Sequence, residues 1–311
     1  MEAEVWSPVM PEGIVVAPPL PGGAAIGWAV GLAVVSTGCY ATSAVLQERE
    51  AARPGPEGAA RLLRLLRRPM WWVAVAATVA AAGLHVAALA LGPLSTVQPL
   101  GVLTLVFALP LGARWAGRVV SRREWAAAGL VVIGLVAVLI VVPQRAPPVV
   151  VGLPTVVATA AVLGGAAAGL FGLAVVLPER VVAVGQAAGA AICFGLASGM
   201  ARLALTGATP FPVGAVVAVL GAATGLAMAQ FAYRRGGLGA PLATLILLDP
   251  LVAVALGVTV LHEPLRVTPG LIALGLAGLI STAWGIWTLA KVPASGLRGE
   301  ATDSSTTPAD G

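Results

Sequence analysis

A single acid, Asp249, lies inside a long apolar run in the second half of the chain and is followed directly by Pro250. The run covers residues 238–263, and at the helical rise of roughly 1.5 Å per residue Asp249 is about 15 Å from its beginning. That position is near the midplane of a hydrocarbon core about 30 Å thick. A charged carboxylate there costs at least about 2.5 kcal/mol, so we expect Asp249 to face a protein cavity or a polar partner. The chemistry that such an acid could provide is a proton or cation site for coupled transport.

A second apolar segment, residues 91–112, repeats this pattern with Gln98 directly before Pro99. Proline has no amide hydrogen and crowds the preceding turn, so it frees carbonyl groups in an apolar helix. Two proline-interrupted segments in corresponding chain halves indicate a binding site between inverted repeats. We therefore predict helix breaks at Pro99 and Pro250, with Gln98 opposite Asp249. Gln98 could equally join two helices by hydrogen bonds.

Three further polar residues are candidates for the cavity or its outer rim. His85 and Gln230 lie in apolar runs of the two halves, where each either lines the cavity or is a hydrogen-bonded interior group. Glu263, beside His262, is placed at the outer rim, where it either binds a cation weakly or is a solvated helix end. Asp249 also has a simpler interpretation, because a buried carboxyl group can stay protonated and hydrogen-bond a neighbouring helix.

The composition places these residues in an integral membrane protein. The 311 residues are 59% hydrophobic and only 10% charged, with a mean hydropathy of +0.97, whereas soluble domains contain about 25% charged residues. Cys39 and Cys193 both fall inside apolar runs, so they indicate neither a disulfide framework nor a metal motif. The single lysine, Lys291, follows the last apolar run and cannot form a P-loop for ATP. No Ser/His/Asp arrangement is visible, and we expect neither an enzyme nor a bound cofactor.

Nine apolar runs have about the 20 residues that a spanning helix needs. They cover roughly residues 24–47, 71–91, 94–113, 124–143, 153–177, 181–204, 211–233, 239–261 and 268–290. With an external N-terminus, 15 of the 18 basic residues fall in cytoplasmic segments, and Arg145, Arg202 and Arg266 remain at the outer side. The positive-inside rule therefore predicts nine transmembrane helices with the N-terminus outside and the C-terminus inside. This distribution explains the pI near 10.2 without nucleic acid.

The strongest basic block, RLLRLLRRP at residues 61–69, follows the first apolar run. Its alternation of leucine and arginine predicts a short amphipathic helix on the inner membrane surface, among anionic lipid headgroups. The acid-rich triplet at residues 48–50 is predicted to end the first helix at the same interface.

Internal matches predict that the helical unit is duplicated. The second and seventh runs share a Gly-Leu pair, the third and eighth share a polar residue before proline, and the fourth and ninth share two glycines at the same spacing. The matched residues are Gly83-Leu84 with Gly225-Leu226, Pro99 with Pro250, and Gly129 and Gly134 with Gly270 and Gly275. Four spans, one joining helix and four further spans make the second unit inverted relative to the first. The glycines of the fifth run, Gly164, Gly165 and Gly169, are predicted to allow close helix packing.

The predicted organisation is therefore an all-α integral membrane protein with an inverted 4+1+4 repeat. Its parts are an extracytoplasmic tail at 1–23, a first unit at 24–143, a joining helix at 144–180, a second unit at 181–290 and a disordered cytoplasmic tail at 291–311.

The duplicated unit, the segments GPLSTVQPL at 92–100 and LLDPLVAVALGVTVLHEPL at 247–265, and the glycine-rich fourth and ninth helices carry a family resemblance. Over about residues 24–290 the chain resembles the drug/metabolite transporter superfamily, which implies transport by alternating access. Nine helices and an external N-terminus resemble the branch of NIPA-type magnesium transporters, whereas more typical members have ten helices and a cytoplasmic N-terminus. The acid that closes the third helix of a repeat in this superfamily is matched by Glu263 in the second unit, while the first unit reaches Glu124 instead.

We therefore expect a multi-pass protein of a bacterial plasma membrane that transports a small metabolite, drug or ion, with Asp249 as the coupling site. One alternative is a magnesium or other divalent-cation transporter, because magnesium keeps several waters and uses only one or two carboxylates. A different alternative is a non-transporting scaffold or lipid-binding protein, with a dry, filled core around Asp249. The expected partners are the lipid bilayer and a small-molecule or ion substrate, with a homodimer as a candidate assembly and no nucleic acid.

Overall fold

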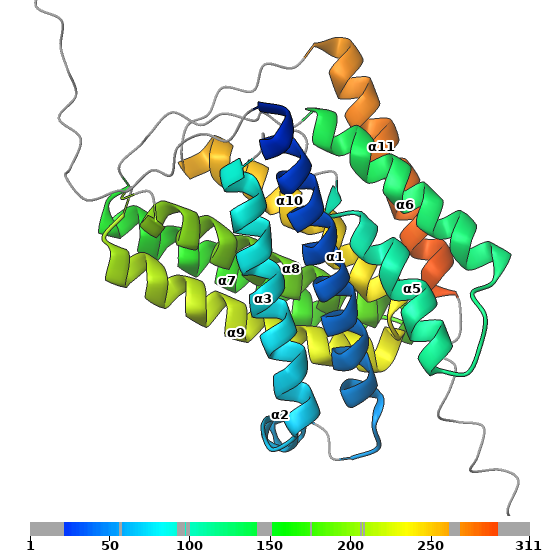
Figure 1. The fold of residues 1–311 in the computed structure, drawn as a ribbon. Helices are drawn as coiled ribbons and strands as arrows, with labels where there is room; N and C mark the ends of the chain where they lie inside the picture. Colours follow the sequence, from blue (N-terminus) through cyan, green and yellow to red (C-terminus); the bar gives the residue numbers. More distant parts are fainter. Residues whose placement is uncertain are drawn as a thin grey trace, which may run out of the picture.

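A computed structural model describes residues 22–55, 58–91, 97, 100–141, 151–174, 176–205, 207, 209–260 and 268–291, and the regular elements assigned within them are all helices. Ten helices have assigned bounds, and Figure 1 labels them. They are α1 (Gly22–Ala52), α2 (Ala59–Leu66), α3 (Pro69–Leu91), α5 (Leu103–Trp115), α6 (Arg122–Val141), α7 (Leu153–Ala174), α8 (Glu179–Leu205), α9 (Phe211–Gly236), α10 (Gly239–Val260) and α11 (Pro269–Ala290). Each predicted apolar run overlaps one of these helices, and the basic block at 61–69 forms the short helix α2.

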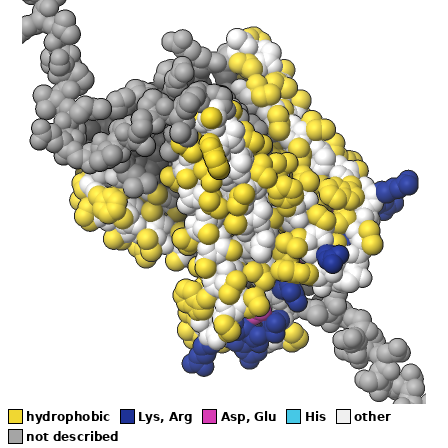
Figure 2. Space-filling model, viewed as in Figure 1, with side chains coloured by type: hydrophobic (Ala, Val, Ile, Leu, Met, Phe, Trp, Pro, Cys, Tyr) yellow, Lys and Arg dark blue, Asp and Glu magenta, His cyan; other side chains and the backbone are white. Residues whose placement is uncertain are grey.

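Within the described residues, seven helices are long and apolar enough to cross a membrane, namely α1, α3, α6, α7, α8, α9 and α11. Helix α5 has only 13 residues, and α10 contributes a shorter apolar stretch, Gly239–Asp249. Large apolar side chains are exposed on the outside of the bundle, such as Val162 on α7, which is 69% exposed, and Ile280 on α11, which is 71% exposed. Figure 2 shows this apolar surface across the visible face. Such a surface suits lipid tails, so the structure is consistent with a multi-pass membrane protein; nine spans remain a prediction.

The helices pack in pairs that join neighbouring segments. Helix α1 packs along α3, and α8 packs along α9. Helix α5 lies on α1, and α10 lies on α8. Helix α6 packs against α11, which is far away in the sequence, and Figure 1 shows these two helices side by side. The contacts of α1 with α3 and α5 in the first half of the chain therefore resemble those of α8 with α9 and α10 in the second half.

The contact between α6 and α11 is close because small residues meet there. A Cβ atom added to Gly134 would lie 2.5 Å from the carbonyl oxygen of Gly278, and one added to Gly278 would lie 2.6 Å from that of Gly134. The hydroxyl group of Ser281 donates a hydrogen bond of 2.9 Å to the carbonyl oxygen of Leu130 across the same contact. Two backbones can approach this closely in a membrane only where side chains are absent or very small.

The glycines of α7 behave differently from this pair. A Cβ atom added to Gly164, Gly165 or Gly169 would meet no atom within 4 Å, so the prediction that they allow close packing in the bundle is wrong. The close approach between α7 and α8 is made instead by Gly189 of α8, where an added Cβ would lie 2.9 Å from the carbonyl oxygen of Ala167. Helix α7 is mostly exposed, because it packs chiefly on α8.

The described basic side chains gather at one end of the bundle, which we call the arginine-rich end. It comprises the end of α1, helix α2, the end of α5, the beginning of α6 and the end of α9. Figure 2 shows arginine and lysine side chains at this end, at the bottom and right of the view. The guanidinium group of Arg49 lies 4.9 Å from the ring centroid of Trp115, which joins the ends of α1 and α5. The positive-inside rule assigns this end to the cytoplasm, and that orientation remains a prediction.

Burial is uneven along the helices. Residues 43–47 of α1 and 240–244 of α10, near the arginine-rich end, are buried on every side, whereas four of the five residues 24–28 of α1 are exposed. The largest cluster of buried apolar side chains, which includes Leu105, Leu109 and Leu242, joins α1, α5, α6, α8, α9, α10 and α11. The bundle is therefore tightly packed toward the arginine-rich end, and a second buried cluster, which includes Met200, Val252 and Leu256, joins α8 and α10 toward the opposite end.

Candidate functional site

Asp249 lies near the middle of α10, and buried residues such as Leu247 and Val252 lie on both sides of it along the helix. Residues 240–244 are buried, and one and a half turns later the side chain of Asp249 is exposed. The carboxyl group is therefore accessible on a helix whose neighbouring side chains are largely buried. This is the environment that a carboxyl group near the middle of an apolar helix needs in order to become charged.

Helix α10 is not interrupted at Pro250, which corrects the expectation of a helix break there. The helix runs continuously from Gly239 to Val260. Proline has no amide hydrogen to donate to the carbonyl group four residues earlier, at Ile246. Membrane helices tolerate this loss because neighbouring helices and small backbone adjustments satisfy the carbonyl group. The proline therefore weakens the helix one turn before Asp249 without ending it.

Tyr40 of α1 is a neighbour of Asp249 that sequence reasoning did not assign to the site. Its side chain is half-buried, and it is near enough to Asp249 for the two groups to interact electrostatically. A phenolic hydroxyl can donate a hydrogen bond to a carboxylate or to a solute bound beside it. The chain has only two tyrosines, so a tyrosine within an apolar helix was the available signal.

Gln230 of α9 belongs to a buried polar network. Its Nε2 atom donates a hydrogen bond of 3.0 Å to Oε1 of Gln47 on α1. Gln47 in turn donates from Nε2 to Oγ of Ser43, at 2.9 Å, and to Oγ1 of Thr78 on α3, at 3.3 Å. Gln230 is therefore a hydrogen-bonded interior group, which is one of the two interpretations that the sequence allowed. The sequence did not reveal its partners, because serine, threonine and glutamine commonly join membrane helices without any motif.

One atom of this network has no protein partner. The Oε1 atom of Gln230 is buried and accepts no hydrogen bond from any residue that the structure describes. A buried acceptor without a donor costs about 1–3 kcal/mol. A water molecule or a solute that donates a hydrogen bond would therefore be stabilised beside Gln230.

The remaining candidates fall into two groups. His85 is half-buried on α3 and lies on the same face as Thr78, two turns further along the helix. That face packs against α1, where Ser36 donates a hydrogen bond of 2.7 Å to the carbonyl oxygen of Ala81. The others lie outside the described residues: Gln98, Pro99, His262 and Glu263.

Glu124 has a structural role at the beginning of α6. The backbone amide of Ser121 donates to Oε2 of Glu124 at 2.8 Å, and the amide of Glu124 donates to Oγ of Ser121 at 3.2 Å. This reciprocal pair is a capping box, which satisfies amide groups at a helix start. Arg118 adds an ion pair of 2.9 Å from Nη1 to Oε1. Glu124 thus begins α6 and does not close the helix before it.

In the parts of the chain that the structure describes, no group of three or more His, Cys, Asp or Glu residues is arranged to hold a metal ion.

Comparison with known proteins places the chain in a family. No family model matches it. No solved structure matches it significantly. An uncharacterized protein of Corynebacterium glutamicum is 31% identical over 267 residues, an alignment that covers 81% of this chain and 91% of the relative. Identity at this level over most of both chains shows common ancestry, and the chain belongs to the same family as this Corynebacterium glutamicum protein.

Proposed function

We propose that the protein is a secondary transporter, similar to the drug/metabolite transporter superfamily, that moves a small metabolite, drug or ion by alternating access. In this proposal Asp249 binds the coupling proton or cation, and Tyr40 of α1 interacts with it electrostatically. The solute reaches Asp249 from the end opposite the arginine-rich end, while the packed arginine-rich end closes the path behind it.

The observation that carries the proposal is the accessibility of Asp249. An exposed carboxyl group in the middle of an apolar helix is costly unless water or a ligand reaches it. Intramembrane acids that face an opening mark ion and substrate pathways more often than structural positions. A scaffold with a filled core around this acid would not leave its side chain exposed.

The helix pairing supports the duplicated architecture of the proposal. The pairs α1–α3 and α1–α5 in the first half of the chain correspond to α8–α9 and α8–α10 in the second half. The α6–α11 contact joins the last helix of one predicted unit to the last helix of the other. A two-unit transporter places its site between the units and moves one against the other, and Asp249 on α10 and Tyr40 on α1 come from different units.

The proposal is tested by transport in proteoliposomes that contain purified protein and a pH-sensitive dye. Pools of small metabolites are added with and without an imposed pH gradient. We expect at least one pool to move protons with the wild-type protein and Asp249→Asn to abolish gradient-driven uptake. The asparagine variant should fold normally, because a neutral amide is cheaper to bury than a carboxylate. Asp249→Glu, which keeps an ionisable group, is the matched control and should retain coupled uptake.

Three outcomes would redirect the assignment. If Asp249→Asn still accumulates solute against a gradient with unchanged pH dependence, Asp249 is not the coupling site. If the same vesicles with a magnesium-sensitive dye show magnesium flux and no proton-coupled solute flux, the divalent-cation alternative is correct. Neither flux under any condition would favour the non-transporting alternative.

A further inference from the structure

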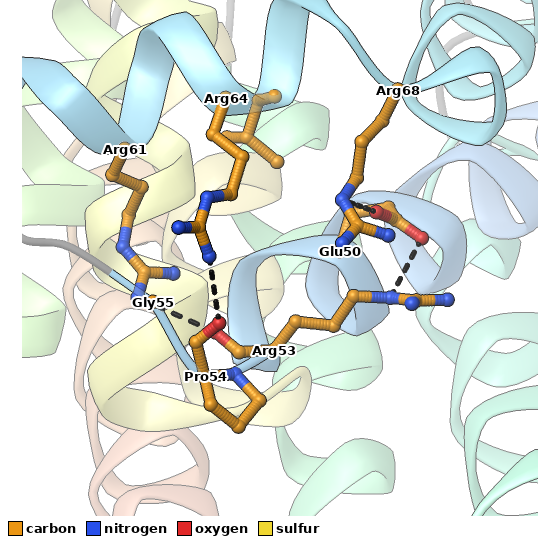
Figure 3. Close-up of a pocket in the computed structure, with 8 residues that line it drawn as sticks. Glu50, Arg53, Pro54, Gly55, Arg61, Arg64 and Arg68 are labelled. Carbon is orange, nitrogen blue, oxygen red and sulfur yellow. Dashed lines mark hydrogen bonds and ion pairs between the residues drawn. The ribbon is translucent and has the colours of Figure 1, made fainter.

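A pocket lies at the arginine-rich end, between the last turn of α1, the loop at residues 53–55 and helix α2 (Figure 3). Its lining contains four arginines and a single carboxylate, so it carries a net positive charge. The lining residues are Glu50, Arg53, Pro54, Gly55, Arg61, Arg64, Leu65 and Arg68. Nothing in the proposed transport path uses this pocket.

The floor of the pocket is fixed by the end of α1. The last carbonyl groups of a helix have no amide partner within the helix. Arg61, whose side chain is buried, donates from Nη1 to the carbonyl oxygen of Ala51 at 2.6 Å and from Nη2 to that of Arg53 at 3.4 Å. Arg64 donates from Nη1 to the carbonyl oxygen of Pro54 at 3.3 Å. These contacts hold α2 against the loop.

Glu50 orients two further arginines. Its buried carboxylate lies 3.0 Å from Nε of Arg53 and 3.5 Å from Nε of Arg68. Both ion pairs are made through Nε, so the Nη atoms of the two guanidinium groups can bind another acceptor. Figure 3 shows Arg53 and Arg68 converging on Glu50 from different elements, whereas Arg64 points to the backbone at Pro54. Guanidinium groups fixed in this way are suited to a phosphate, which they bind through paired hydrogen bonds.

Helix α2 presents apolar side chains outward, next to the pocket. Arg61 and Leu65 face the protein, whereas Leu63 is 61% exposed and Leu66 is 46% exposed. Trp72, at the beginning of α3, is 52% exposed and donates from Nε1 to the carbonyl oxygen of Leu66 at 2.8 Å. A short helix with outward leucines and adjacent arginines lies in the headgroup region of a membrane, with its apolar face toward the acyl chains.

We propose that this pocket binds an anionic phospholipid. Arg53, Arg64 and Arg68 contact the phosphate, and the acyl chains lie along Leu63 and Leu66. A free phosphate ion would use the arginines but not the leucines, whereas a phospholipid uses both. The bound lipid joins the end of α1 to the beginning of α3, because α2 connects these two helices.

The test uses native mass spectrometry of the full-length protein in a neutral detergent. Palmitoyl-oleoyl phosphatidylglycerol is titrated in parallel with phosphatidylcholine of the same chains, and we expect a clear preference for the anionic lipid. Replacing Arg53 and Arg64 together by glutamine should weaken phosphatidylglycerol binding roughly 30-fold, from about 1 kcal/mol per basic residue at a membrane surface. The matched control is Arg122→Gln with Arg123→Gln, two exposed arginines at the beginning of α6, which should leave the affinity near that of the wild-type protein.

Further experiments distinguish binding of the phospholipid from binding of a free anion. Leu63→Ser with Leu66→Ser should weaken phosphatidylglycerol binding, and millimolar inorganic phosphate should compete poorly with it. Phosphate that binds as tightly as the lipid would overturn the lipid assignment and leave an anion site. Equal affinity for phosphatidylglycerol and phosphatidylcholine would overturn the site altogether. So would an equal loss of phosphatidylglycerol affinity in the Arg53/Arg64 and Arg122/Arg123 double variants. If the double variant fails to fold, Arg64→Gln alone serves, since it removes one exposed hydrogen bond, and unchanged lipid affinity in that variant would also overturn the site.

Discussion

Replacing Gly134 by alanine should destabilise the bundle by driving α6 away from α11. The new Cβ atom would collide with the side chain of Thr282 and would lie 2.5 Å from the carbonyl oxygen of Gly278 and 2.8 Å from the amide nitrogen of Thr282. Two of these three atoms belong to the backbone, so a change of rotamer cannot relieve the contact. The helices themselves must move apart.

The magnitude follows from comparison with a second glycine on the same helix. A Cβ atom added to Gly129 would meet no atom within 4 Å. Both glycine-to-alanine changes raise helix propensity, by about 0.5–1 kcal/mol. That gain cancels when the two variants are compared, and the remaining difference is the overpacking at Gly134, about 1–3 kcal/mol.

Thermal unfolding of both variants in the same detergent measures this difference. Gly129→Ala should melt at or slightly above the wild-type temperature, and Gly134→Ala should melt several degrees lower. The scale is about 2–4 °C per kcal/mol for a chain of 150–250 residues, taken from soluble proteins. Equal melting temperatures for the two variants would refute the close α6–α11 contact. Thr282→Ala added to Gly134→Ala should restore only part of the stability, because the backbone contacts remain.

Three further predictions concern other parts of the chain. Gln47→Leu should lower the melting temperature, because Nε2 of the buried Gln230 loses its acceptor, at about 1–3 kcal/mol; a melting temperature equal to the wild type would show that water replaces it. Glu124→Ala should lower it through loss of the capping box, by about 0.5–2 kcal/mol, and an unchanged value would contradict the capping role. In a background without the native cysteines, Val5→Cys should react with an impermeant thiol reagent added to intact cells, and Ser305→Cys only after permeabilisation. Labelling of position 305 in intact cells would rule out an odd number of spans with the N-terminus outside.

The helices could be located from the sequence because hydropathy is a local property. A spanning helix must satisfy its own backbone within lipid, so long apolar segments are a direct signal. Helix α2 was recognisable for a similar reason, since leucine and arginine alternate at helical spacing. The end of α1, near the acid-rich triplet at residues 48–50, followed from the same change in polarity; the helix ends at Ala52.

Packing was less predictable, because similar compositions lead to different contacts. The glycines of α6 and α7 look alike in the sequence, yet Gly134 touches a backbone and Gly165 faces open space. Which side of a helix faces a partner depends on the rotation of the helix about its axis, and an apolar helix with few polar residues does not reveal it. The partners of Gln230 and the continuity of α10 at Pro250 depend on neighbouring helices in the same way. Sequence reasoning could identify polar residues in apolar runs but not their neighbours.

In the proposed transport cycle, the leucines buried near the arginine-rich end determine how much free energy it costs to open that end. Opening the arginine-rich end to water would wet leucines that are now buried, including Leu105, Leu109 and Leu242. Each exposed leucine costs about 1.5–3 kcal/mol, so wetting three of them opposes the change by roughly 5–9 kcal/mol. The form with the arginine-rich end closed should therefore dominate at rest. In the proposed transport cycle a solute bound at Asp249 would populate the open form only if its binding offsets this free-energy cost.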